Sequence, residues 1–205
     1  MTEMTGEVLA QIRGQVGCIT LNRPKALHAL TLSMCETMIG ALLDWREDPE
    51  IYMVLIDHSG ERGFCAGGDI RGMVEASQLD AAGWRQRMRG LHGWVTDLIE
   101  LDRPVIAAVD GSAFGAGFSL ALAADMVVAT PRARFCMSFL RIGFVPDCGA
   151  LFTLPRVVGV QRAREIMLSA REVGAEEALR LGIAMELVPP EDLQARARAL
   201  AASFV

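Results

Sequence analysis

Two glycine-rich segments, each placed between an apolar run and a helical pattern, constrain the fold of this chain most. Residues 63–70 have the sequence GFCAGGDI and residues 110–117 have the sequence DGSAFGAG. Glycine permits backbone angles with positive φ and a close approach of a ligand to the main chain. The first amides of a helix lack an intrahelical acceptor and lie at the positive end of its dipole. The segments are therefore either tight turns that pack helices closely, or loops whose amides converge on one oxygen as an oxyanion hole.

The order of the other elements predicts an α/β fold. Residues 7–11 and 15–21 are expected to form two strands joined by a turn at Arg13 and Gly14. Thr31 is a candidate N-cap for a helix that extends to about residue 48. Apolar runs predict buried strands, and the remaining patterns predict helices. The strands are expected at 52–57, 104–109 and 126–129, and the helices at 70–101, 118–124 and 194–205. Strands and helices thus alternate along the chain, with no interdomain linker.

The composition is that of an ordinary globular chain. Of its 205 residues, 52% are hydrophobic and 22% are charged, and the formal net charge is -5. This length suits one domain, which we divide into a core at residues 1–190 and the start of a truncated C-terminal helical region at residues 191–205. The acidic balance and the lack of a dense Lys/Arg run argue against nucleic acid as a partner.

The cysteines and the N-terminal sequence favour a cytoplasmic protein without a metal centre. An odd number of cysteines in apolar surroundings predicts free thiols, and no Cys-x-x-Cys pair suggests zinc. They are Cys18, Cys35, Cys65, Cys136 and Cys148. Residues 1–6 lack the apolar core of a signal peptide. The most apolar stretch, residues 105–130, is interrupted by Asp110, Asp125 and glycines, so we expect buried core there and no membrane span.

Several ordered motifs resemble one family. These are ITLNRPKALHAL at residues 19–30, the first glycine loop, the block at residues 104–125 and the block at residues 141–156. Together they resemble the enoyl-CoA hydratase/isomerase (crotonase) superfamily over most of the chain, from residue 8 to residue 193. The resemblance implies the crotonase-like spiral of repeated ββα units, assembled as a homotrimer or hexamer. It also implies an acyl-coenzyme A thioester as substrate, with coenzyme A as part of that substrate and no separate cofactor.

The resemblance also assigns site residues. It implies that the amides of Ala66 and Ala116 form the hole for the thioester carbonyl. It places Ser119 and Phe139 at the positions where hydratases of the family carry two glutamates. The substrate-binding positions that it implies are Lys25, Ala26, Leu27, Ala66, Gly67, Gly68, Asp69, Ile70, Gly115, Ser119 and Phe139. Neither Ser119 nor Phe139 is a general base at neutral pH, which argues against hydration by the family's usual mechanism.

One carboxylate remains near these positions. The segment 135–149, which contains Phe139 and Asp147, resembles the ring-epoxide isomerases of phenylacetate breakdown, which also isomerise double bonds of acyl-CoA. A single base that removes a proton and returns it elsewhere on the substrate suits such an isomerisation. We therefore expect an isomerase with Asp147 as its one general acid/base. The plainer alternative is that Asp147 caps the helix that follows it.

Two other functions stay open at the level of sequence. One is a hydratase or hydrolase with an unusual base, such as Glu75 or Asp80 on the helices after the first loop. The other is a crotonase-fold protein that binds coenzyme A without catalysis. The lost glutamates favour this last alternative, as do Ala116 at a position that is commonly glycine and a chain that stops at Val205, before the helices with which family members usually continue.

Overall fold

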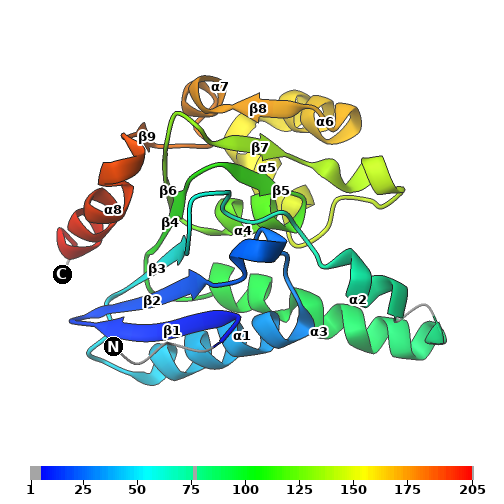
Figure 1. The fold of residues 1–205 in the computed structure, drawn as a ribbon, viewed down its shortest axis with the longest axis horizontal. Helices are drawn as coiled ribbons and strands as arrows, with labels where there is room; N and C mark the ends of the chain where they lie inside the picture. Colours follow the sequence, from blue (N-terminus) through cyan, green and yellow to red (C-terminus); the bar gives the residue numbers. More distant parts are fainter. Residues whose placement is uncertain (1–5, 76–77, 205) are drawn as a thin grey trace.

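A computed structural model describes residues 6–75 and 78–204 and contains one large mixed sheet (Figure 1). The strands of this sheet follow the order β1-β2-β3-β4-β6-β9. Their bounds are β1 Val8–Arg13, β2 Val16–Leu21, β3 Met53–His58, β4 Val105–Val109, β6 Met126–Ala129 and β9 Glu186–Leu187. Strands β1 and β2 pair antiparallel as the expected hairpin, and every later pair is parallel. The predicted α/β class is confirmed.

The two central strands are buried on both faces, as their unbroken apolar runs predict. Every residue of β3 and β4 is buried. Side chains alternate between the faces of a strand, so consecutive residues enter different cores. Val54 and Ile56 pack into the larger core with α1 (Leu32–Glu47) and α3 (Ala81–Ile99). Met53 and Leu55 pack on the opposite face.

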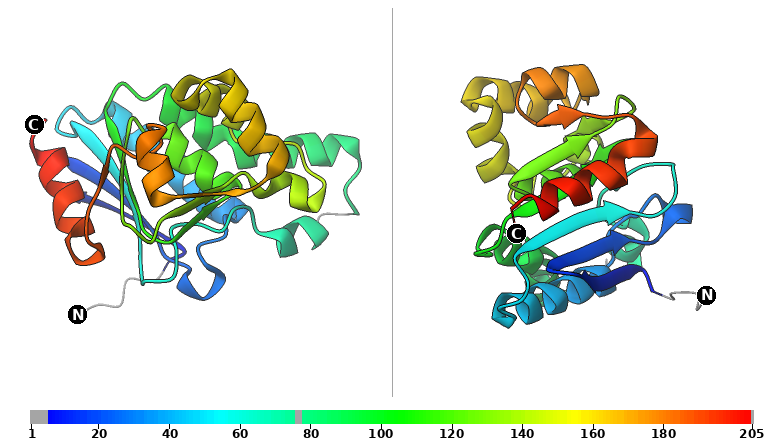
Figure 2. Two further views of the ribbon diagram at one scale, coloured as in Figure 1. Left: turned by 90° about the horizontal axis from the view of Figure 1, so that it is seen from above. Right: turned by 90° about the vertical axis from the view of Figure 1, so that its left-hand side faces the viewer.

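Helix α8 (Leu193–Ala202) covers that opposite face. Its residues Leu193, Ala197 and Leu200 join one apolar cluster with β3, β4 and β6. The right-hand view in Figure 2 shows α8 lying across the strands. The division expected at residue 190 falls at the short 3₁₀ helix η4 (Pro190–Asp192), which leads directly into α8.

Thr31 begins α1 as expected. Its side-chain oxygen accepts a hydrogen bond from Met34 N at 3.1 Å, and the helix ends before Asp48. Helices α1 and α3 lie side by side beneath the sheet in Figure 1. The helical pattern at residues 70–101 becomes two helices, α2 (Ile70–Glu75) and α3, whose N-cap is Asp80.

A second, three-stranded sheet corrects one expectation. Residues 112–114 of the predicted second loop form strand β5 (Ser112–Phe114), because β7 (Arg134–Cys136) supplies a parallel partner far along the chain. Strand β8 (Glu172–Gly174) pairs antiparallel with β7. The helix expected at residues 118–124 is α4 (Ala116–Ala123), which begins inside the glycine segment. The glycine loop is therefore shorter than expected.

Three further helices lie beside this smaller sheet. They are α5 (Ala150–Val158), α6 (Val160–Ser169) and α7 (Ala175–Arg180). In Figure 1 they gather above α4, away from α1 and α3. Among the helices in the described ranges, we find none that is both long enough and apolar enough to cross a membrane.

Candidate active site

Main-chain hydrogen bonds hold the two glycine loops side by side. Cys65 N donates to the Ser112 oxygen and Phe114 N donates to the Cys65 oxygen, each at 2.9 Å. A β-carbon on Gly67 would lie 3.0 Å from the Phe114 oxygen and 3.6 Å from the Ala116 nitrogen. Gly67 also has a φ of 107°, which residues with side chains rarely adopt. Both constraints require glycine there, and they place the first loop against the start of α4.

The amide that was expected to serve the oxyanion hole from the first loop is already engaged. Ala66 N donates to the Leu27 oxygen at 2.9 Å, because the segment after η1 (Pro24–Ala26) runs beside the loop. The assignment of the Ala66 amide to the hole is therefore wrong. Gly68 N has no acceptor in the described ranges, and neither has the N–H of Ala116, the first residue of α4. These two free amides come from the two adjacent loops.

An apolar cavity of about 230 Å³ lies beside both loops. Gly68, Gly115 and Ala116 form part of its wall. Apolar side chains from α2, α3 and the segment around η3 (Ser138–Ile142) form much of the rest, among them Ile70, Met73, Trp84, Met88, Phe139 and Phe144. Apolar walls lower the local dielectric constant, so a charge or hydrogen bond inside such a cavity acts more strongly than in water.

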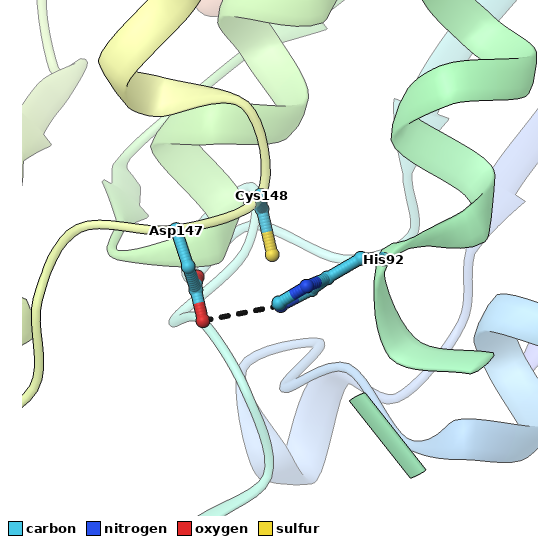
Figure 3. Close-up of side chains that lie close together, drawn as sticks. All are labelled: His92, Asp147 and Cys148. Carbon is cyan, nitrogen blue, oxygen red and sulfur yellow. Dashed lines mark hydrogen bonds and ion pairs between the residues drawn. The ribbon is translucent and has the colours of Figure 1, made fainter. Parts of the chain in front are cut away.

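Asp147 is the single carboxylate among the described residues that line this cavity. Its Oδ2 lies 3.2 Å from Nε2 of His92 on α3. Figure 3 shows the two side chains pointing toward each other from α3 and from the segment that precedes α5. The other oxygen, Oδ1, is buried and has no hydrogen-bond partner in the part of the chain that the structure describes. A buried oxygen without a partner is costly unless a ligand or a proton satisfies it.

The interpretation of Asp147 as a helix cap is wrong. The N-cap of α5 is Gly149, and it makes no side-chain capping hydrogen bond. Cys148 and Gly149 both have left-handed backbone angles, with φ of 51° and 78°. The main-chain oxygen of Asp147 accepts a hydrogen bond from Ala150 N, the first amide of the helix, at 3.0 Å, whereas its side-chain carboxylate lies at the cavity beside His92.

Cys148 forms a cluster with Asp147 and His92 that has the spacing of metal ligands. One ligand atom from each of the three residues lies within 4.8 Å of the others (Figure 3). These are the residues of the site that could hold a divalent ion, and zinc would require the thiolate of Cys148. Burial, followed by the negative charge of Asp147, raises the pKa of this thiol. The thiol therefore keeps its proton near neutral pH, and the expectation of a site without metal stays a prediction.

The structure brings some of the expected site residues together at the cavity and leaves others outside it. Of the predicted residues, the cavity wall contains Ala66, Gly67, Gly68, Ile70, Gly115, Ala116, Phe139 and Asp147, but not Lys25, Ala26, Leu27, Asp69 or Ser119. Asp69 forms an ion pair with Arg23 at 3.0 Å, and Lys25 is exposed on η1. Ser119 is fully buried, and its hydroxyl donates to the main-chain oxygen of Asp147 at 3.1 Å. Ser119 does not line the cavity in this structure, and its expected contact with the substrate stays a prediction.

Of the two expected alternative bases, the structure describes the side chain of Asp80 but not that of Glu75. Asp80 is exposed and caps α3, since its Oδ1 accepts a hydrogen bond from Gly83 N at 2.8 Å. It does not line the cavity, so it is unsuited to act as a base there. Glu75 is the last residue of α2, and its side chain lies outside the described part of the structure.

His92 was not expected at the site. It precedes Asp147 by 55 positions and belongs to no motif. The sequence signal that could have found it is the helical spacing of Trp84, Met88 and His92, which places all three on one face of α3. That spacing alone is equally typical of a helix that packs into the core.

Comparisons with known proteins identify one family. The model of the enoyl-CoA hydratase/isomerase family matches residues 11–205. The carnitinyl-CoA dehydratase of Salmonella typhi is 40% identical over 187 residues, which cover 91% of this chain and 70% of that protein. The same-named protein of Escherichia coli is 39% identical over 192 residues and is covered to 72% of its length, against 94% of this chain.

Solved structures show the same architecture. An enoyl-CoA hydratase/isomerase from Cupriavidus metallidurans superposes with a TM-score of 0.89 at 42% identity, covering 96% of this chain and 73% of that one. An enoyl-CoA hydratase from Polaromonas sp. JS666 gives a TM-score of 0.90 at 33% identity, covering 97% of this chain and 77% of that one. The fold and the paired loops thus define a crotonase-fold, acyl-CoA-processing enzyme. The chain belongs to the enoyl-CoA hydratase/isomerase family.

Proposed function

We propose that this protein isomerises the double bond or ring of an acyl-CoA thioester through an enolate, with Asp147 as the single general acid/base. The observation that carries the proposal is the position of the Asp147 carboxylate. It lines the same apolar cavity as the free amides of Gly68 and Ala116, and its Oδ1 is buried without a partner among the described residues.

The chemistry follows from this arrangement. The amides of Gly68 and Ala116 hold the thioester oxygen, where negative charge develops when a neighbouring C–H bond breaks. Asp147 takes that proton, and the electron pair of the C–H bond enters the enolate. The same carboxyl group then returns a proton to another carbon of the conjugated system as the double bond moves. The step needs no bound water, which agrees with Phe139 on the cavity wall.

The thioester is proposed to approach along η1. Leu27 bonds through its main-chain oxygen to the first loop, and Lys25 is exposed two residues earlier. A lysine at the rim of a site suits a phosphate of coenzyme A. Ala26 and Asp69 remain proposed contacts on the same side, outside the acyl cavity.

A dehydratase is the second candidate, because the curated relatives at about 40% identity are named carnitinyl-CoA dehydratase. In that reaction Asp147 would remove the α-proton of a 3-hydroxyacyl-CoA and pass it to the departing hydroxyl group, which would leave as water while the C–O electron pair goes with it and the double bond forms. Loss of the usual glutamates, with Ser119 and Phe139 in their place, favours the isomerase.

We also propose a homotrimer or hexamer. Large apolar side chains lie exposed on α5 and α6, namely Leu151, Phe152, Val160 and Leu168. Such exposure on neighbouring helices suits contact with another copy of the chain. Light scattering behind a sizing column measures the assembly, and a monomer at micromolar concentration would contradict this proposal.

The test of catalysis uses proton NMR in deuterium oxide with a 3-enoyl-CoA and a 3-hydroxyacyl-CoA. Asp147→Asn is expected to lower turnover by at least about 100-fold, because an amide cannot accept the proton. Asp80→Asn is the matched control, since asparagine caps a helix as well as aspartate does. Full activity of Asp147→Asn would refute the proposed base. Water loss from the hydroxyacyl substrate without double-bond migration would favour the dehydratase. Thioester binding without any turnover or exchange would favour a non-catalytic protein.

A further inference from the structure

A second group that can bind and release a proton, His92, lies next to Asp147. His92 Nε2 lies 3.2 Å from Asp147 Oδ2, within hydrogen-bond reach, and the two side chains point toward each other in Figure 3. About one third of each side chain is exposed, at 35% for His92 and 33% for Asp147. The pair therefore lies between the interior of the cavity and its surroundings.

His92 is the member of the pair that faces outward. It lines the acyl cavity, and it also lines two open surface depressions beside α3. One depression includes Arg85, Arg89 and Thr96, which share a face of α3 with His92 because they lie three, four or seven residues away. Asp147 lines the cavity but neither depression.

The second ring nitrogen of His92 is free to meet water. Nδ1 makes no hydrogen bond within the described residues and is not among the buried polar atoms that lack a partner. An imidazole accepts a proton at one nitrogen and releases another from the second, so it can pass protons along a line. In His92, Nε2 thus faces Asp147 and Nδ1 faces solvent.

We propose that His92 is a proton relay that connects Asp147 with solvent, so that the proton taken from the substrate exchanges with water before one is returned. This inference rests on the proposed function, since it assigns Asp147 the first transfer. The C–H bond breaks and an O–H bond forms on Asp147, with the electron pair left in the enolate. The Asp147 O–H bond then breaks as an N–H bond forms at Nε2 of His92, whose neutral ring carries its own proton on Nδ1 at this step. The proton on Nδ1 leaves to water, and the reverse sequence delivers a solvent proton to the product.

The relay makes a prediction about the deuterium that is incorporated into product per turnover. A purely structural role of His92 would leave this ratio unchanged. In deuterium oxide with a 3-enoyl-CoA, the wild-type protein is expected to place close to one solvent deuteron in each product molecule. His92→Gln keeps an amide N–H that can hold Asp147, but it cannot take up and release protons. We expect the deuterium incorporated per turnover to fall at least about tenfold in His92→Gln while double-bond migration continues by direct return of the original proton.

Matched variants distinguish a role of His92 in proton transfer from a role in packing. Thr96→Val changes the same face of α3 one turn further on and is expected to leave the ratio unchanged. His92→Ala with added imidazole is expected to regain deuterium incorporation, because the free base replaces the missing ring. Circular dichroism of each variant checks that α3 stays folded.

The possible failures of the relay and of the proposed base are distinguishable. Asp147→Asn is expected to lose both migration and exchange, and its full activity would refute the base whatever His92 does. Wild-type migration without deuterium uptake would overturn the relay and leave the base intact. A His92→Gln protein that incorporates deuterium per turnover like the wild type would also overturn the relay.

Discussion

Gly117 lies so close to the main chain at Cys65 that a β-carbon on residue 117 would be 2.3 Å from the Cys65 oxygen. This contact joins the helix α4 directly to the first glycine loop, and the neighbour that it meets is backbone, which cannot rotate away. Gly68 belongs to the first glycine loop and Ala116 is the first residue of α4, so this contact joins the two segments that carry the free amides.

Gly117→Ala is therefore expected to destabilise the protein by at least about 2 kcal/mol, because the added methyl group forces the two loops apart. Gly40→Ala is the matched control, since a β-carbon on this exposed residue of α1 meets no atom of the described residues within 4 Å. Alanine favours a helix, so this control is expected to gain about 0.5–1 kcal/mol. Urea unfolding measures both changes, and a stable Gly117→Ala protein would contradict the contact.

His28 is expected to make the fold sensitive to acid. It is almost fully buried, and burial, followed by the charge of His58, lowers the pKa of His28 from 6.5 to about 4. Its Nδ1 accepts a hydrogen bond from Arg23 N at 3.0 Å, which requires the unprotonated nitrogen. The unfolded chain binds a proton at this residue between those two pH values and the folded chain does not, so stability is lost as the pH falls from about 6.5 to about 4.

The loss from this residue is expected to be on the order of 2–3 kcal/mol. His28→Asn removes the titration, and asparagine tolerates the left-handed backbone angle of 56° at this position. Unfolding free energies measured from pH 7 to pH 4 should fall less steeply for His28→Asn than for the wild type. Parallel slopes for the two proteins would refute the assignment.

The ion pair of Asp110 with Arg132 is expected to stabilise the end of β4. Asp110 is buried, which by itself disfavours its charge, but hydrogen bonds from Arg132 and Thr130 outweigh burial and lower its pKa. A lowered carboxyl pKa stabilises the folded state above the ordinary carboxyl range, and that stability is lost as the pH falls through the lowered value. Arg132→Met should lower the melting temperature at pH 7, and the difference from wild type should shrink toward pH 3. Equal melting temperatures at pH 7 would count against the pair.

The cysteines near the cavity are expected to resist alkylation. Burial raises the pKa of Cys65 to about 12, and burial together with Asp147 raises that of Cys148. Because the thiolate is the reactive form, iodoacetamide at pH 8 should label these residues only after unfolding. Mass spectrometry of peptides from native and urea-treated protein measures this. Fast labelling of Cys148 in the native protein would show that the thiol is ionised or exposed.

Local patterns in the sequence predicted most of the elements. Thr31 marked the start of α1, and the apolar runs at 52–57 and 104–109 marked the two strands that are buried on both faces. Strand β5 was missed, because three residues between glycines carry no strand pattern of their own. They become a strand only through pairing with β7, about twenty residues further on.

Some residues of the candidate site could likewise be predicted from the sequence, and others were found only in the structure. The fold family, the two glycine segments and Asp147 as the carboxylate near them could be predicted from the sequence, since these depend on residue types at fixed spacing along the chain. Three further features come from the packing of the chain: Ala66 N donates to the Leu27 oxygen, the Ser119 hydroxyl donates to the main-chain oxygen of Asp147, and His92 lies beside Asp147. Such hydrogen bonds depend on how distant segments pack against one another, and the local sequence carries no record of that packing.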